Sequence, residues 1–227
     1  MMRCLSDVLG LMDEMTSYLR LRGMRFTKDG FPILSRKHFL DRPPKTIVPY
    51  DFRNTRCVEN PSETVLCFFC ADARIYPRLE KMLLELEEYR RFMGVVASDV
   101  TVTSDMDPEW QTAIMQLNQL HMAVLAVNGI KVVANLRRGS PETLAHLKHI
   151  PCNAMWATGF LGCADGLPQD MDFIKAVLAV SPSMLLIYGR RDPNAMEKLD
   201  AMGVRYKVYP DYHKLSRQRT QTERRSR

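Results

Sequence analysis

The sequence predicts an α/β fold built on a mostly parallel sheet of about six strand–helix units. Short apolar runs alternate along the chain with segments of helical periodicity, which is typical of parallel sheets. The runs are nearly continuous in apolar character, as expected for strands covered by helices. We interpret six runs as strands, at residues 65–69, 95–97, 132–134, 155–157, 184–187 and 206–209. A barrel-like sheet and an open doubly wound sheet both fit this pattern.

The chain divides into three regions. Residues 1–62 combine an amphipathic helix at 4–22 with a proline-rich segment expected to wrap the domain. This segment contains one short extended piece at 46–50, which Pro49 would confine to a sheet edge. Residues 63–212 form the predicted α/β domain, and residues 213–227 form a basic tail.

Helix boundaries in the α/β domain are marked by proline. Asp107, Ser140 and Asp192 each precede a proline, the arrangement of an N-cap followed by the first helical residue. We expect the longest helix at 108–128, largely apolar after its first turn, and another helix at 76–92.

The charge is uneven along the chain. The net charge is +6, and residues 213–227 carry six Lys or Arg residues against one Glu, which leaves +1 for the rest. A polar basic tail is expected to be disordered and to bind nucleic-acid phosphates or to act as a solubilising terminus. The candidate phosphate contacts are Arg217, Arg219, Arg224 and Arg225. No apolar stretch approaches the ~20 residues of a membrane span, so a cytoplasmic location is the default expectation.

The six cysteines are expected to be free thiols that pack as small apolar residues. Cys67 and Cys70 resemble a metal or redox pair, but they lie within an apolar strand and no second close pair completes a zinc site. We therefore interpret both as packing residues.

Two carboxylates follow consecutive strands. Asp72 and Asp99 could approach one another at the carboxyl ends of those strands, where parallel sheets build their sites. Such a pair could perform two-carboxylate hydrolysis or hold Mg²⁺. The alternative is that both side chains cap the segments that follow them. Asp99 lies nine residues before Pro108, too far to cap that helix, which favours a functional role.

Arginine pairs also follow two of the predicted strands. Arg137 and Arg138 come after Asn135, and Arg190 and Arg191 come after Tyr188. Guanidinium groups bind phosphate and carboxylate bidentately, so these positions indicate an anionic ligand, with solvated loop charge as the alternative.

A glycine-rich loop follows another strand. Thr158 and Gly159 begin the stretch 158–166, in which glycines would let a ligand approach the backbone. The stretch matches neither the dinucleotide fingerprint nor the Walker loop, and a flexible turn is the simpler account.

Several motifs occur in a recognisable order. They are Phe68-Phe69-Cys70-Ala71-Asp72, Gly94-Val95-Val96-Ala97-Ser98-Asp99-Val100-Thr101, Asn135-Leu136-Arg137-Arg138-Gly139, Thr158-Gly159-Phe160-Leu161-Gly162-Cys163 and Ile187-Tyr188-Gly189. In this order residues 64–190 resemble an uncharacterised domain-of-unknown-function family of bacteria, phages and plasmids. The chain departs from that family at Ser98, where the family has proline, and at Arg138, where it has tryptophan. The resemblance implies an α/β fold and a mobile-element setting, with Asp99, Asn135, Arg137 and Gly139 as recurring positions, and it implies no activity.

Two functional hypotheses follow. The first is an enzyme acting on a phosphorylated or otherwise anionic ligand, with Asp99, aided by Asp72, as general base or metal ligand. Arg137 and Arg190 would orient the anion in that case. The second is a non-catalytic factor of a mobile element that associates with nucleic acid or with a host component. The sequence leaves the cofactor undetermined, with a divalent cation such as Mg²⁺ as one candidate.

Overall fold

The protein contains a seven-stranded, all-parallel sheet. The structure is a computed structural model that describes residues 5–160 and 170–225. Within these residues the strands are β1 (Thr46–Pro49), β2 (Thr64–Cys67), β3 (Gly94–Val96), β4 (Val132–Asn135), β5 (Met155–Phe160), β6 (Met184–Gly189) and β7 (Tyr206–Tyr209). They are ordered sequentially from β1 to β7. All six predicted strands are present, and the extended piece at 46–50 is β1, an edge strand as Pro49 predicts.

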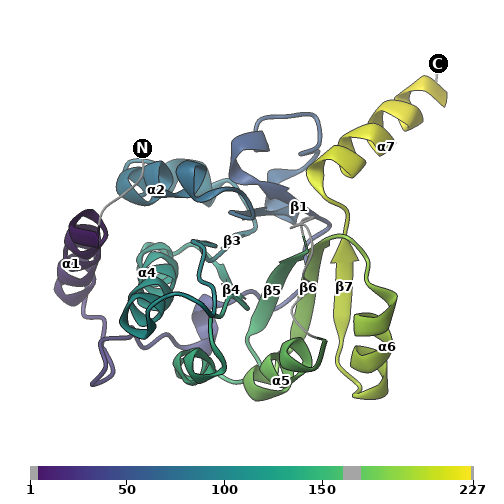
Figure 1. Ribbon diagram of the computed structural model, residues 1–227. Coiled ribbons are helices and arrows are strands. Elements are labelled where there is room, and N and C mark those ends of the chain that lie inside the picture. Colours follow the sequence, from purple (N-terminus) through teal and green to yellow (C-terminus); the bar gives the residue numbers. More distant parts are fainter. Residues whose placement is uncertain (1–4, 161–169, 226–227) are drawn as a thin grey trace.

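The sequential strand order explains why the sheet curls into a near-barrel (Figure 1). An open doubly wound sheet reverses its order at a switch point, so that helices cover both faces. Here successive crossovers of one hand place the helices on one face only, and the sheet curves around the other. Side chains of β7 contact the segment that leads into β1, because Tyr209 Oη and Lys207 Nζ donate to the Pro44 carbonyl at 2.8 and 2.9 Å.

The two faces of the sheet bury separate apolar clusters. The inner cluster draws side chains from every strand, including Ile47, Val96, Val133, Leu186 and Tyr209. The larger outer cluster takes the alternate strand residues together with the helices. This division follows from the period-2 alternation of side chains along a strand. The inner cluster therefore fills the interior of the near-barrel.

The helices lie outside the sheet (Figure 1). They are α1 (Leu5–Leu21), α2 (Asp72–Lys81), α3 (Leu86–Arg90), α4 (Pro108–Val127), α5 (Asp170–Val180), α6 (Pro193–Ala201) and α7 (Tyr212–Arg225). Short 3-10 helices occur at η1 (Arg36–His38), η2 (Tyr50–Phe52), η3 (Pro61–Glu63) and η4 (Pro141–His149). The helix predicted at 76–92 begins earlier, at Asp72, and divides into α2 and α3. An ion pair spans the turn between α2 and α3: Arg78 Nη1 lies 2.8 Å from Glu85 Oε1.

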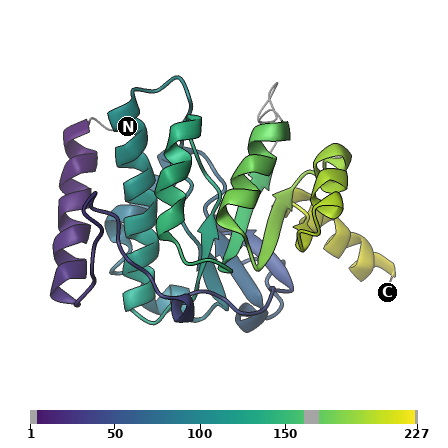
Figure 2. The same cartoon turned by 90° about the horizontal axis from the view of Figure 1, so that it is seen from below.

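Helix α1 lies beside α4, and α4 lies between α1 and the sheet (Figures 1 and 2). Val8, Met12, Met15 and Leu19 are buried along one face of α1, as its helical spacing predicts. Because α4 is enclosed on both sides, its residues from Leu117 to Ala126 are buried without interruption. The polar groups in this stretch therefore need partners inside the protein.

The basic tail follows β7, and Tyr212–Arg225 form its helix α7. The tail is attached at its start, where Tyr212 stacks on Phe52 with ring centroids 3.6 Å apart and its backbone N–H donates to Tyr188 Oη. An ion pair between Arg219 and Glu59 holds it further along. These contacts come from segments distant in sequence, which composition does not reveal.

The described cysteines are free thiols, as expected. Cys57 and Cys67 are buried, Cys70 is half-buried, and Cys152 is exposed, so the packing interpretation fails for Cys152. Cys4 and Cys163 lie outside the described residues. None of the helices described is both long enough and apolar enough to cross a membrane.

Candidate functional site

Asp99, Asn135 and Arg137 meet at the carboxyl ends of β3 and β4. Arg137 donates from Nε to Oδ1 and from Nη2 to Oδ2 of Asp99, both at 2.8 Å. Asn135 donates from Nδ2 to Asp99 Oδ1 at 2.7 Å and to the Ser98 carbonyl at 3.1 Å. A paired guanidinium–carboxylate contact of this kind fixes the plane of the arginine. The structure thus brings together three of the residues predicted for the site.

Burial is unequal across this ion pair. The side chain of Asp99 is 12% exposed and that of Arg137 is 33% exposed. Both oxygens of Asp99 accept hydrogen bonds from the protein, so Asp99 is suited to positioning Arg137 more than to accepting a proton from a substrate. Among the described residues, no group of three or more His, Cys, Asp or Glu side chains could hold a metal ion.

Helix α4 holds the loop that carries Asp99. Asn118 Oδ1 accepts from Ser98 Oγ at 2.8 Å and from the Val100 N–H at 3.1 Å. Its Nδ2 donates to the Val100 carbonyl at 3.2 Å, and His121 Nδ1 accepts from the Ser98 N–H at 3.1 Å. The backbone on both sides of Asp99 is therefore bonded to buried side chains. Neither Asn118 nor His121 was singled out from the sequence; the available signal was two polar residues three apart on an apolar helix.

His121 is neutral and structural. Burial lowers the pKa of its imidazole to about 3. Because Nδ1 accepts a hydrogen bond, the ring proton is on Nε2, which is buried with no hydrogen-bond partner among the described residues. The ring lies edge-on to Phe68, with centroids 5.1 Å apart. This residue therefore supports the Asp99 loop and does not reach the surface.

Asp72 reaches the same loop from another side. Its Oδ1 accepts from the Thr101 N–H at 3.1 Å and from Thr101 Oγ1 at 2.9 Å. Asp72 is the first residue of α2, whose N-cap is Ala71, so it does not cap that helix as the alternative interpretation supposed. Asp72 thus contacts the loop that carries Asp99, whereas Asp99 contacts Asn135 and Arg137 at the end of β4. Their joint catalytic role stays a prediction.

Gly159 has a packing explanation. A Cβ atom at this position would lie 2.8 Å from Cγ and Cδ1 of Phe69. Phe69 in turn stacks on Tyr188, with ring centroids 5.6 Å apart, and both belong to the inner cluster. The absence of a side chain at Gly159 therefore lets the two rings close the carboxyl end of the interior. Thr158, beside it on β5, is half-buried, and residues 161–166 of the glycine loop lie outside the described residues.

The two arginine pairs, Arg137–Arg138 and Arg190–Arg191, do not converge on a common contact. Arg190 is exposed just after β6, which is two strand spacings from β4, or about 10 Å across the sheet. Arg191 donates from Nε to Met196 Sδ at 3.3 Å, and Arg138 makes only a long contact of 3.4 Å with the Gly139 carbonyl. Arg137 is therefore the best-ordered cation at these strand ends.

Half-buried Cys70 also lies at this end, directly after β2. Burial, assisted by the charge of Asp51, raises the pKa of its thiol to about 11. Burial also raises the pKa of Cys67, which is enclosed in the inner cluster. Neither cysteine is a nucleophile at neutral pH.

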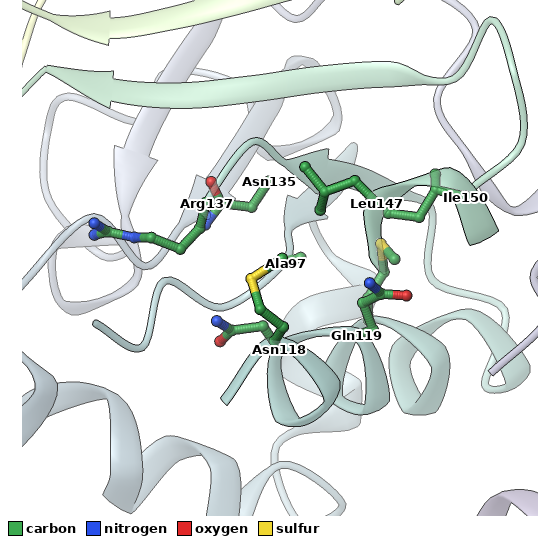
Figure 3. A pocket seen from close by; sticks show the side chains of 9 residues that line it. Ala97, Asn118, Gln119, Asn135, Arg137, Leu147 and Ile150 are labelled. Carbon is green, nitrogen blue, oxygen red and sulfur yellow. The ribbon is translucent and has the colours of Figure 1, made fainter. Parts of the chain in front are cut away.

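A small cavity adjoins the ion pair on its buried side (Figure 3). Its volume is about 10 Å³, and Asn118, Gln119, Asn135 and the stem of Arg137 border it. That volume accommodates about one water molecule and excludes an organic ligand. The guanidinium of Arg137 points away from the cavity (Figure 3). A ligand of this site would therefore bind at the outer ends of the strands.

All three predicted N-cap positions are confirmed, and the side chains at two of them make capping hydrogen bonds. Asp107 accepts from the Glu109 and Trp110 N–H groups, and Asp192 accepts from those of Asn194 and Ala195.

Ser140 occupies the predicted N-cap position before Pro141, but its side chain makes no capping hydrogen bond. Thr143 Oγ1 bonds the first turn of η4 instead: it accepts from the Gly139 N–H and donates to the Ser140 carbonyl.

The chain was compared with protein-family models, with curated proteins and with solved structures, and no match was found in any of the three comparisons.

Proposed function

We propose that the protein binds a small ligand through a phosphate or carboxylate group at the carboxyl ends of β3 and β4, with Arg137 contacting the anion. The observation that carries this proposal is the paired contact of Arg137 with Asp99. An arginine held in this way loses less side-chain entropy when it binds an anion.

The polarity of the pair supports the same proposal. Asp99 is the more buried partner and Arg137 the more exposed one, so the positive group is presented to solvent. Asn135 adds a third donor to the carboxylate and fixes its rotation. Arg190 would supply further positive charge from β6, near enough to attract an anion through solvent. In this arrangement Asp99 is a positioning residue.

A thermal-shift screen of sugar phosphates, nucleotides and small carboxylates tests the proposal. A ligand that binds the native state raises the melting temperature by mass action. Arg137→Gln should reduce the shift, and Arg137→Lys should restore it only in part, because lysine lacks the planar fork. Arg25→Gln, at an exposed position outside the site, is the matched control and should leave the shift unchanged. A stabilising ligand whose effect is the same in wild type and Arg137→Gln would place binding elsewhere.

A second candidate function is nucleic-acid binding through α7. The observation that favours it is that this basic segment is helical and projects from the body of the protein (Figure 1). Binding would be electrostatic and independent of sequence. Within α7, Lys214 and Arg217 are exposed.

Fluorescence anisotropy with labelled DNA and RNA at two salt concentrations tests this candidate. Affinity should fall steeply between about 50 and 200 mM salt. Lys214→Glu combined with Arg217→Glu should weaken binding, whereas Arg25→Glu combined with Lys28→Glu, the same charge change at exposed sites elsewhere, should not. Equal affinity of the two double variants for DNA and RNA would show that α7 is not the nucleic-acid interface.

A further inference from the structure

An open groove of about 490 Å³ lies at the amino-terminal end of the sheet, opposite the Asp99 site. It is formed by the residues that precede β5, β6 and β7, by the end of α5 and by η1. Its volume falls within the roughly 300–1,000 Å³ range of small-molecule sites. The cavity beside Asn135, by contrast, holds only about one water molecule.

Two arginines give the groove its charge. Arg205 donates from Nε and Nη2 to the Ser183 carbonyl at 3.1 and 2.8 Å, and Arg36 donates from Nη1 to the Leu40 carbonyl at 3.2 Å. These bonds orient both guanidinium groups through neutral backbone partners, so neither charge is cancelled there. The residues that line the groove, all within the described part of the chain, include no carboxylate. The groove is therefore electropositive.

Unusual backbone geometry is concentrated in the same place. Asn153 and Ser181 have φ values of 60° and 43°, and among the described residues they are the only non-glycine residues with positive φ. Both line the groove, and the Asn153 N–H donates to the Ser181 carbonyl at 3.2 Å. Ser181 directly follows α5 and its N–H donates to the Val177 and Leu178 carbonyls, so its left-handed backbone ends that helix. The two loops thus place Asn153 and Ser181 side by side at the groove.

Part of the groove's lining, called here the apolar wall, is Val177, Leu178, Pro182 and Val204. Leu178 is 52% exposed, which is unusual for a large apolar side chain in this protein. The wall and the arginines together match a molecule with one anionic group and one apolar part.

We propose that this groove is a second binding site, for an organic phosphate whose phosphate group contacts Arg36 and Arg205 and whose apolar part lies on Leu178. Guanidinium groups bind phosphate oxygens through several parallel hydrogen bonds. Phosphate is assigned over carboxylate because two arginines and the side-chain amide of Asn153 offer more donors than a carboxylate can accept. The site is separate from the proposed Arg137 site and does not depend on it.

Isothermal titration calorimetry of the full chain with phenyl phosphate, inorganic phosphate and benzoate tests the proposal. Phenyl phosphate should bind more tightly than either of the other two, because each of them lacks one of its two contacts. The expected advantage over inorganic phosphate is about tenfold, the value of a half-buried ring contact. Equal or tighter binding of benzoate would overturn the phosphate assignment.

Variants separate the two contacts. Arg36→Gln and Arg205→Gln should each weaken phenyl phosphate about tenfold, as expected for loss of a charged hydrogen-bond donor. Leu178→Ser should remove the preference for phenyl phosphate over inorganic phosphate and leave inorganic phosphate binding unchanged. Arg25→Gln is the control for loss of an exposed arginine. If Arg205→Gln does not fold, the affinities of Arg36→Gln and Leu178→Ser for phenyl phosphate are sufficient to test the groove assignment.

The two proposed sites fail independently. Arg137→Gln should leave phenyl phosphate binding in the groove unchanged, and Arg36→Gln should leave the Arg137-dependent thermal shift unchanged. Wild-type affinity for phenyl phosphate in Arg36→Gln, Arg205→Gln and Leu178→Ser would overturn the groove assignment. Loss of phenyl phosphate binding in Arg137→Gln alone would assign the ligand to the other end of the sheet.

Discussion

Arg137 contacts both carboxylate oxygens of Asp99, with Nε and Nη2 each 2.8 Å from the oxygen they meet. The two residues come from loops after neighbouring strands, and Asn135 at the end of β4 completes the arrangement. Because Asp99 is the more buried of the two, the pair should respond differently to removal of each partner.

Arg137→Leu should destabilise the protein more than Asp99→Ala. The first change leaves a carboxylate that is only 12% exposed without its counter-charge, whereas the second leaves a guanidinium that can reach water. We expect losses of about 3 and about 2 kcal/mol in the free energy of unfolding. The double variant should lose less than the sum, with a coupling of about 1–2 kcal/mol. Urea denaturation measures all four proteins, and additive losses would show that the ion pair contributes nothing.

His121 should make stability depend on pH. Its pKa falls from 6.5 in the unfolded chain to about 3 in the native protein, so the unfolded state binds more protons between these values. Stability is therefore complete above about pH 6.5 and decreases as the pH falls toward 3, by about 1.4 kcal/mol per unit from this group. His121→Gln keeps an acceptor for the Ser98 N–H and should flatten the pH profile. His213→Gln, at an exposed position, is the control. An unaltered slope in His121→Gln would contradict the assignment.

Gly159→Ala should destabilise the protein by about 1–3 kcal/mol, the usual cost of overpacking. The added methyl group would lie 2.8 Å from the Phe69 ring, which is held by Tyr188 and cannot retreat without cost. Gly10→Ala is the matched control, because no atom lies within 4 Å of its Cβ position in α1. That change should stabilise the helix by about 0.5–1 kcal/mol. Thermal denaturation of the two variants should therefore show shifts of opposite sign.

The three proline-linked caps should not be equivalent. Asp107→Ala and Asp192→Ala each remove a side chain that accepts two backbone N–H groups, and should cost about 1 kcal/mol. Ser140→Ala removes no capping bond and should cost less than about 0.5 kcal/mol. Chemical denaturation of the three variants tests this ranking. A loss at Ser140 equal to that at Asp107 would mean that its hydroxyl caps η4 in solution.

The C-terminal helix should depend on one ring contact. Phe52→Ala removes the surface on which Tyr212 stacks, and should free α7 to fray from its first turn. Limited trypsin digestion should then cleave after Lys214 and Arg217 faster than in wild type. Phe26→Ala, at a half-buried ring away from α7, controls for general loosening. Equal cleavage rates in the two variants would show that the stack does not hold the helix.

The sequence by itself determined the order of the elements. Alternation of apolar runs with helical segments located all six predicted strands, and Asp-Pro pairs located the starts of α4 and α6. It also predicted that Asp99, Asn135 and Arg137 lie at one end of the sheet, because parallel strands bring their carboxyl ends to one edge. These features depend on residues close together in the sequence, so they can be predicted from one amino-acid sequence.

Only the tertiary structure decided what each of these residues contacts. The sheet curls into a near-barrel because the strands pair in sequential order, a long-range property that the apolar runs do not encode. Asn118 and His121 hold the Asp99 loop across about twenty residues of chain, and α7 is attached through Phe52, 160 residues earlier than Tyr212. Partners so far apart are brought together by the burial of apolar surface. That driving force is non-directional, so a local sequence pattern does not specify which distant residues will meet.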